Sequence, residues 1–137
     1  MVIQKSFVIS TPGRGIQEIT ENIDTIIAAS EISEGLCNIF IQHTSASLLI
    51  CENADIDVRK DLETFMSRIV PDGDPDFLHN AEGVDDMPAH IRSVLTQAEL
   101  SVPIVNSQCE LGAWQGIYLW EHRFISHQRR VRVTLLE

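Results

Sequence analysis

The sequence lacks long hydrophobic runs and has few basic residues. No apolar stretch approaches the ~18 residues that a membrane-spanning helix needs, so a membrane-embedded protein is not expected. Ten lysines and arginines stand against twenty aspartates and glutamates, which gives a formal net charge of −10. An acidic surface repels the phosphate backbone, and nucleic-acid binding is therefore not expected either. A small phosphorylated ligand held by a few local arginines is still compatible with this composition.

The sequence also lacks paired cysteine motifs. Its three cysteines, Cys37, Cys51 and Cys109, are odd in number and show no Cys-x-x-Cys spacing. Cys37 and Cys109 lie in apolar, strand-like surroundings, which indicates small buried hydrophobic residues. Residues 1–5 begin a strand pattern and do not resemble a signal peptide. We therefore expect a reducing, cytoplasmic setting.

Glycine-rich nucleotide-binding loops are absent as well, because neither GxxxxGK[ST] nor GxGxxG occurs. What is present is a chain of 137 residues with 44% hydrophobic residues, which is enough for one domain with a substantial core. No internal repeat or linker divides it. We expect a single domain over residues 1–137.

The hydrophobic pattern predicts both helices and strands. Isoleucines at 16, 19, 23, 26 and 27 fit one face of a helix over residues 16–29. A second helix is expected after Asn53 or Asp55 and a third after Asp86, because these side chains can cap a first turn. Strand-like runs cover 2–9, 36–42, 48–50, 102–105, 109–111, 117–120 and 131–136, with a tight turn at 106–107. Helices and strands do not alternate regularly, which favours a compact α+β domain with a largely antiparallel sheet and about three helices.

Three histidines lie in polar, turn-rich segments. His43 opens a hydroxyl-rich stretch, and His79 and His90 flank an acidic loop. Imidazoles with carboxylates nearby are ligands that zinc prefers, so we predict a divalent metal on His43, His79 and His90 with a coordination position left open. Zinc suits imidazole best, and manganese, iron and nickel are alternatives. The spacing is not a dedicated metal motif, so surface or hydrogen-bonded core histidines are the competing interpretation.

Four carboxylates are candidates for proton transfer or for orienting a histidine: Glu52, Asp85, Asp86 and Glu121. Helix capping alone explains Asp86. Asp85 precedes the cap, and Glu121 ends an apolar strand beside His122. A carboxylate that accepts an imidazole proton fixes the tautomer and raises the basicity of the ring. We therefore predict Asp85 and Glu121 as the catalytic carboxylates.

Several polar side chains are candidates for substrate binding. The hydroxyls of Ser45 and Ser47 and the guanidinium of Arg123 can hold a phosphate, although a turn at a strand end also explains the serines. Trp114 and Gln115 fit the stacking and hydrogen bonding of a flat heterocycle, although a core tryptophan explains Trp114 equally well. The basic run at 129–132 is expected at the solvated edge of a strand, with salt bridges between subunits as the alternative.

Four stretches of the sequence carry a family resemblance: QHTSASL at 42–48, EN at 52–53, GVDDMPAHI at 83–91 and LGAWQGI at 111–117. Together with EHR at 121–123 they resemble the YjbQ family, an uncharacterised-protein family often described as secondary thiamine-phosphate synthase. The likeness runs over essentially the whole length. The family usually has threonine at the position of Ala113 and commonly asparagine at that of Cys51, so any hydroxyl contact at position 113 is lost here.

The resemblance implies a compact α+β fold assembled as a homotrimer, with a metal on the three histidines near the subunit contacts. It also implies a metal-dependent enzyme on a small phosphorylated substrate, with Asn53 of the second stretch as a further substrate-binding residue. The implied reaction is that of thiamine-phosphate synthase, in which a pyrimidine methyl diphosphate loses pyrophosphate and is attacked by the nitrogen of a thiazole phosphate. Metal-assisted hydrolysis is an alternative reaction, and a non-catalytic trimeric metal- or metabolite-binding module is an alternative function.

Overall fold

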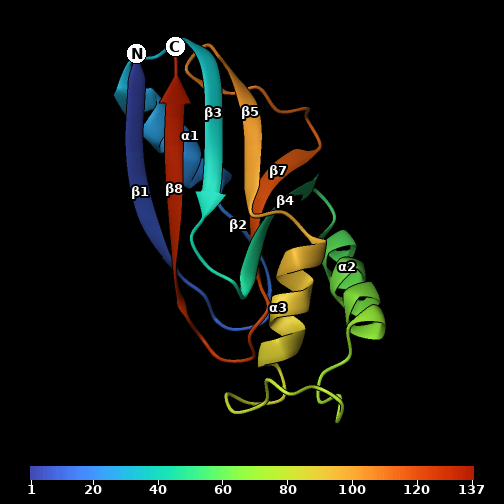
Figure 1. The fold of residues 1–137 in the computed structure, drawn as a ribbon. Helices are drawn as coiled ribbons and strands as arrows, with labels where there is room; N and C mark the ends of the chain where they lie inside the picture. The colour runs from blue at the N-terminus through green and yellow to red at the C-terminus, as the bar shows by residue number, and fades with distance from the viewer.

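Two antiparallel sheets form the centre of the computed structural model, which describes all 137 residues (Figure 1). The larger sheet has the strand order β1-β8-β3-β5-β6 and the smaller one has the order β2-β7-β4. The strands are β1 (Val2–Ser10), β2 (Gly15–Glu18), β3 (Glu34–Ile41), β4 (Ala46–Glu52), β5 (Glu99–Val105), β6 (Gln108–Cys109), β7 (Gln115–Glu121) and β8 (Gln128–Leu136). The helices are α1 (Thr20–Ser30), α2 (Ile56–Ile69) and α3 (Asp86–Leu95). The expected α+β class with antiparallel sheets and three helices is confirmed.

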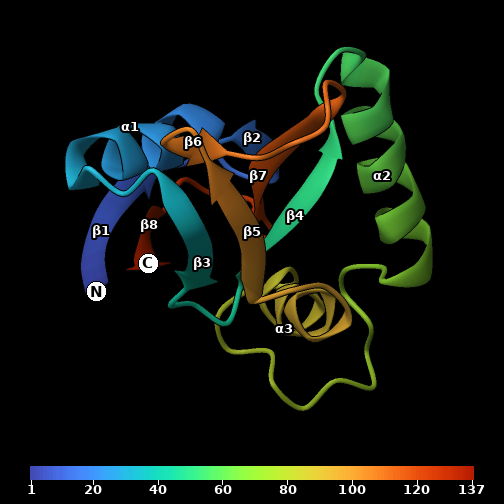
Figure 2. The same cartoon turned by 90° about the horizontal axis from the view of Figure 1, so that it is seen from above.

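The main core lies between the two sheets and α1, which covers one face of the larger sheet (Figures 1 and 2). Ile23 and Ile27 of α1 pack there against residues of β3 and β8. Strand β8 shows how the sequence produces this layer, because every second side chain of a strand points to the same face. Val131, Val133 and Leu135 are fully buried, while Arg130 is exposed on the opposite face.

The opposite face of the larger sheet carries no helix (Figure 1). Apolar side chains lie exposed on this open face, among them Val8, Leu36, Phe40 and Leu136. None of the three helices combines the length and the apolar character needed to span a bilayer.

Two expectations about the elements were wrong. The helix expected from residue 16 begins at Thr20, because residues 15–18 pair with β7 and form the edge strand β2. The basic run at 129–132 is not the solvated strand edge that was expected, because β8 pairs with both β1 and β3 and Arg129 is buried, although Arg130 is exposed. In both cases a long-range strand pairing decides the structure, and periodicity within one segment does not reveal such pairings.

Helices α2 and α3 enclose a smaller core beside the three-stranded sheet, where Met66 and Val70 pack against Trp120. His122 is fully buried there, with its ring centroid 5.2 Å from that of Trp120. Its Nε2 lies 2.8 Å from the hydroxyl of Ser47, and its Nδ1 has no partner. Burial, followed by the charges of Arg92, Arg14 and Arg129, lowers the pKa of His122 to about 3, so the ring is neutral at pH 7.

The buried His122 predicts a loss of stability in mild acid. In the unfolded chain its imidazole takes up a proton near its ordinary pKa of 6.5, whereas the folded protein resists protonation until about pH 3. The unfolded state then binds more protons, so the free energy of unfolding falls as the pH drops, by about 2 kcal/mol between pH 6.5 and 4.5. Urea unfolding of the wild type and of His122→Gln should give a shallower pH dependence for the variant by about this amount. Equal pH dependences would mean that His122 titrates freely in the folded protein.

Candidate functional site

A buried ion pair joins the end of β7 to the start of β8. The Glu121 side chain is 1% exposed and that of Arg129 is 4% exposed. Oε1 of Glu121 accepts hydrogen bonds from Nε of Arg129 at 2.8 Å and from the hydroxyl of Thr11 at 2.7 Å. Oε2 accepts one from Nη2 of Arg129 and another from the backbone amide of Arg123 at 3.2 Å. Burial opposes ionisation of Glu121, but the bonds from Arg129 and Thr11 outweigh it and lower the pKa.

Arg123 continues this network to the start of α3. Its Nε donates to Asp85 at 2.9 Å, its Nη1 to Asp86 at 2.9 Å and its Nη2 to the carbonyl of Glu82 at 2.9 Å. Burial opposes ionisation of Asp85, yet the amide of Phe124 and the guanidinium of Arg123 lower its pKa overall. The planar guanidinium therefore fixes both carboxylates at once.

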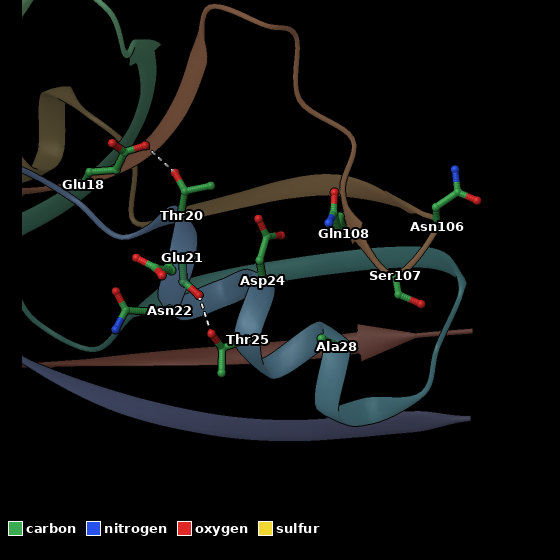
Figure 3. A pocket seen from close by; sticks show the side chains of 10 residues that line it. All are labelled: Glu18, Thr20, Glu21, Asn22, Asp24, Thr25, Ala28, Asn106, Ser107 and Gln108. Carbon is green, nitrogen blue, oxygen red and sulfur yellow. Dashed lines mark hydrogen bonds between the residues drawn. The ribbon is translucent and has the colours of Figure 1, made fainter.

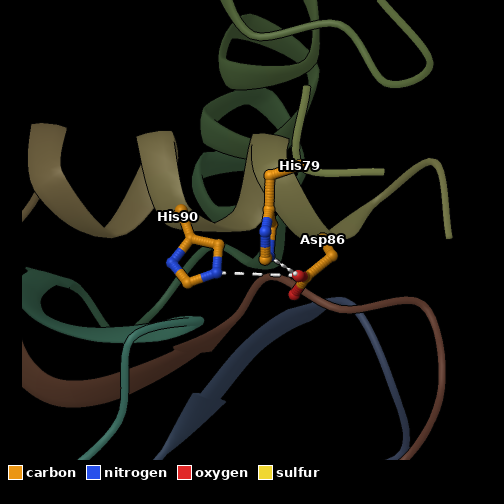
Figure 4. A group of neighbouring side chains, drawn as sticks. All are labelled: His79, Asp86 and His90. Atoms are coloured by element: carbon orange, nitrogen blue, oxygen red, sulfur yellow. Dashed lines mark hydrogen bonds and ion pairs between the residues drawn. The ribbon is translucent and has the colours of Figure 1, made fainter. Parts of the chain in front are cut away.

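Two imidazoles and one carboxylate converge next to this arginine. The ligand atoms of His79, Asp86 and His90 all lie within 4.8 Å of one another (Figure 4). Oδ2 of Asp86 is 2.7 Å from Nε2 of His79 and 3.6 Å from Nε2 of His90. Asp86 and His90 are four residues apart on α3 and share one face of it, whereas His79 comes from the preceding loop.

This donor set fits a divalent metal such as zinc. Metal–ligand bonds near 2.1 Å in a tetrahedral site place ligand atoms ~3.4 Å apart. The distance between His90 and Asp86 already matches, and that between His79 and Asp86 would widen by less than about 1 Å as a metal replaces the shared proton. The side chains of His79 and His90 are 52% and 33% exposed, so further coordination positions face solvent.

A hollow of about 260 Å³ adjoins His79, with Phe77, Asn80, Met87 and Pro88 among its walls. A larger hollow of about 740 Å³ runs along α1 and the turn between β5 and β6 (Figure 3). Its walls carry carboxylates, amides and hydroxyls but no imidazole or thiol. The hollow beside His79 is therefore the better match for a metal-dependent site.

His43 does not belong to the group formed by His79, Asp86 and His90 in this chain. Its Nε2 accepts the backbone N–H of Arg130 at 2.7 Å, and its Nδ1 lies 3.4 Å from Nη1 of Arg129. Burial and the charge of Arg129 lower the pKa of His43. The Arg130 amide occupies the lone pair of Nε2, and the candidate metal group within this chain consists of His79, Asp86 and His90, without His43.

The predicted catalytic and phosphate-binding groups at this end are already engaged by protein partners. Glu121 accepts a hydrogen bond from Arg129, and Asp85 accepts one from Arg123. Arg123 also donates to Asp86 and to the carbonyl of Glu82. The hydroxyl of Ser45 accepts from Arg129 at 2.9 Å, and Ser47 is buried against His122. These contacts favour positioning roles over the proton transfer and phosphate binding expected from the sequence.

The remaining substrate-binding candidates lie at the other end of the small sheet. Antiparallel pairing runs from Ala46 opposite Glu121 to Glu52 opposite Gln115, which is roughly 20 Å along the strands. Asn53 donates to the carbonyls of Ala113 and Gln115 at 3.3 and 3.2 Å, and Trp114 is 67% exposed. Within one chain, Asn53, Trp114 and Gln115 are thus separated from the histidines.

The sequence did not identify Asp86 as a candidate metal ligand, because helix capping explained it. The structure places Asp85 at the cap position and Asp86 in the first turn of α3. The spacing Asp-x-x-x-His at the start of a predicted helix was the available signal, since it puts both side chains on one face.

Comparison with known proteins places these residues in a family. The sequence profile described as "UPF0047 protein YjbQ-like" matches residues 5–137. "UPF0047 protein sll1880" from Synechocystis is 48% identical over 130 residues, covering 95% of this chain and 88% of the relative. "UPF0047 protein YjbQ" from Escherichia coli O157:H7 is 40% identical over 136 residues, covering 98% of each.

Solved structures agree with this result. An uncharacterised YjbQ/UPF0047 family protein from Clostridium acetobutylicum superposes with a TM-score of 0.84 at 31% identity, covering 98% of this chain and 99% of that one. The conserved hypothetical protein TT1486 from Thermus thermophilus gives a TM-score of 0.86 at 30% identity, covering 96% and 99%. The chain belongs to the YjbQ (UPF0047) family.

Proposed function

We propose that this protein is a metal-dependent enzyme that acts on a small phosphorylated substrate, with zinc held by His79, Asp86 and His90. The observation that carries the proposal is the convergence of two imidazoles and one carboxylate whose remaining coordination sphere is open to solvent. Three protein ligands with an open position are the pattern of catalytic zinc, whereas structural zinc is enclosed by four.

The ion-pair network gives Asp86 its role in this proposal. Arg123 holds Oδ1 of Asp86 and leaves Oδ2 directed at His79 and His90. Asp86 would therefore bind the metal through one oxygen, in an orientation fixed by Arg123 and, through Arg123, by Asp85. A zinc ion bound there supplies a Lewis acid for a phosphoryl oxygen or lowers the pKa of a bound water.

The charge and the lining of the hollow beside His79 indicate which kind of substrate the site can bind. The chain has a net charge of −10, and Asp74 lies in the wall of the hollow beside His79. A phosphate group entering this hollow would be repelled unless a cation neutralised it, which is the contribution expected of a divalent metal. The apolar walls at Phe77 and Met87 suit the organic part of such a substrate.

The reaction we propose first is the one that the family resemblance implies, a thiamine-phosphate synthase-type transfer with loss of pyrophosphate. Metal-assisted hydrolysis of a phosphate ester uses the same groups and is the alternative reaction. A non-catalytic metal- or metabolite-binding module is the alternative function. We also propose a cytoplasmic location, which suits the three free cysteines.

We further propose that the protein is a homotrimer whose subunits meet through the open face of the larger sheet. Exposed Leu36, Phe40 and Leu136 lie on adjacent strands β3 and β8 of this face. Burying such a patch against another copy removes apolar area from water, and Arg130 and Arg132 beside it offer charges for pairing.

Metal binding should depend on His79 and His90 but not on His43. Isothermal titration of metal-free protein with zinc should give one ion per chain for the wild type and for His43→Ala. His79→Ala and His90→Ala should bind at least about tenfold more weakly, because each removes one of three ligands. Loss of zinc in His43→Ala together with full binding in His90→Ala would contradict the proposed ligand set.

Turnover should follow metal content. The zinc-loaded wild type, assayed with thiamine precursors and a panel of phosphate monoesters, should release pyrophosphate or phosphate, and His90→Ala should show no activity above background. His43→Ala is the matched control and should retain activity. A fully metal-loaded wild type without turnover on the whole panel would favour the binding-module alternative.

Light scattering should give a mass three times that of the 15.4 kDa chain at micromolar concentration. Phe40→Glu places a charge in the open face and should yield monomers. Phe65→Glu, an equivalent change at an exposed position of α2, should leave the assembly intact. A monomeric wild type would contradict the trimer.

A further inference from the structure

A third hollow lies between β2 and the first half of α2, and none of the proposed metal ligands lines it. It has a volume of about 340 Å³. Its walls include three basic side chains, Arg14, Arg59 and Lys60, and two apolar ones, Ile16 and Ile56. In a chain with twice as many acidic as basic residues, such a concentration of positive charge is unexpected.

The charges of this basic groove are only partly compensated. Glu63 is its single carboxylate, and Oε2 of Glu63 accepts a hydrogen bond from the fully buried Arg92 at 2.6 Å. Arg14 is held by both oxygens of Asp72, at 2.7 and 2.9 Å. Arg59 and Lys60 form no ion pair, so two positive charges remain available to a ligand.

Arg59 is held in an unusual way. Its guanidinium carbon lies 5.1 Å from the ring centroid of Tyr118, and no protein acceptor receives any of its N–H groups. Nε of Arg59 is buried without a partner, and so is the hydroxyl of Tyr118, a residue with no exposed surface. Glu18 and Glu52 lie near this hydroxyl, but neither pairs with Arg59.

A buried donor without an acceptor is destabilising, and the cation–π contact offsets only part of this cost. The stacked guanidinium is thus oriented in advance while its hydrogen bonds remain unmade. An acceptor that enters the groove can satisfy the terminal N–H groups of Arg59, which lines its wall.

We propose that the basic groove binds the phosphate group of a small organic phosphate. Arg59 contributes the planar donors that match phosphate geometry and Lys60 a point charge, while Ile16 and Ile56 contact the organic part. The volume lies at the small end of the range for ligand pockets, which limits the ligand to a compact molecule. This site stands independently of the metal ligands and of the reaction proposed above.

The test measures binding of phenyl phosphate and of inorganic phosphate to the full chain by isothermal titration and by NMR of the arginine Nε–H groups. Phenyl phosphate should bind more tightly than inorganic phosphate, because only the former reaches the apolar walls. Arg59→Gln and Lys60→Gln should each weaken binding by about tenfold, the loss expected for one charge-assisted contact. Arg68→Gln is the matched control, because it removes one positive charge from the exposed last turn of the same helix.

A metal-site variant separates the two sites. Without added zinc, where the histidines hold no cation for a phosphate group, His79→Ala should bind phenyl phosphate as the wild type does. Loss of binding in His79→Ala with retention in Arg59→Gln would assign the phosphate to the histidines and overturn the proposal. Equal affinity of the wild type, Arg59→Gln and Lys60→Gln would overturn it as well. Lys60 is exposed, so its variant remains informative even if Arg59→Gln fails to fold.

Discussion

The ion pair between Glu121 and Arg129 is the constraint on which the candidate site depends. Both groups are almost completely removed from water, and an isolated charge in such a place would cost several kcal/mol. The two must therefore stay together, and the remaining acceptors and donors must be satisfied nearby. Thr11, Ser45 and the amide of Arg123 do this, so the loop after β1, the start of β4 and the end of β7 are tied to one point.

From this ion pair, the hydrogen-bond network extends towards solvent through Arg123 and then through Asp86. Arg123 follows Glu121 by two residues and holds Asp85 and Asp86, which lie at the start of α3. Asp86 in turn contacts the exposed His79 and the half-buried His90. The interior charges thus fix the orientation of the almost fully buried Asp86 carboxylate, and such orientation is what a metal ligand needs. His43 is half-buried in the same network, against Arg129 and Arg130.

Local features of the fold could be predicted from the sequence. Asp55 caps α2 by accepting the amide of Asp57 at 2.9 Å, and Asn106 and Ser107 both adopt positive φ in the tight turn between β5 and β6. Pairings between distant segments could not be predicted in this way. The edge strand β2 exists because β7 lies beside it. Strand β8 supplies a backbone amide to the ring of His43, which lies outside the candidate metal group. Asp86 fits two local patterns, a helix cap and an Asp-x-x-x-His pair on one helix face. Only the positions of Arg123 and His79 decide between these two interpretations.

The most direct test of this account is a crystal structure of the zinc-loaded protein with diffraction data collected on both sides of the zinc absorption edge. The account predicts one anomalous peak per chain within about 2.3 Å of Nε2 of His79, Oδ2 of Asp86 and Nε2 of His90, with Arg123 still bound to Oδ1 of Asp86. A zinc peak coordinated by His43 without Asp86, or zinc-loaded crystals with no peak between His79 and His90, would contradict it.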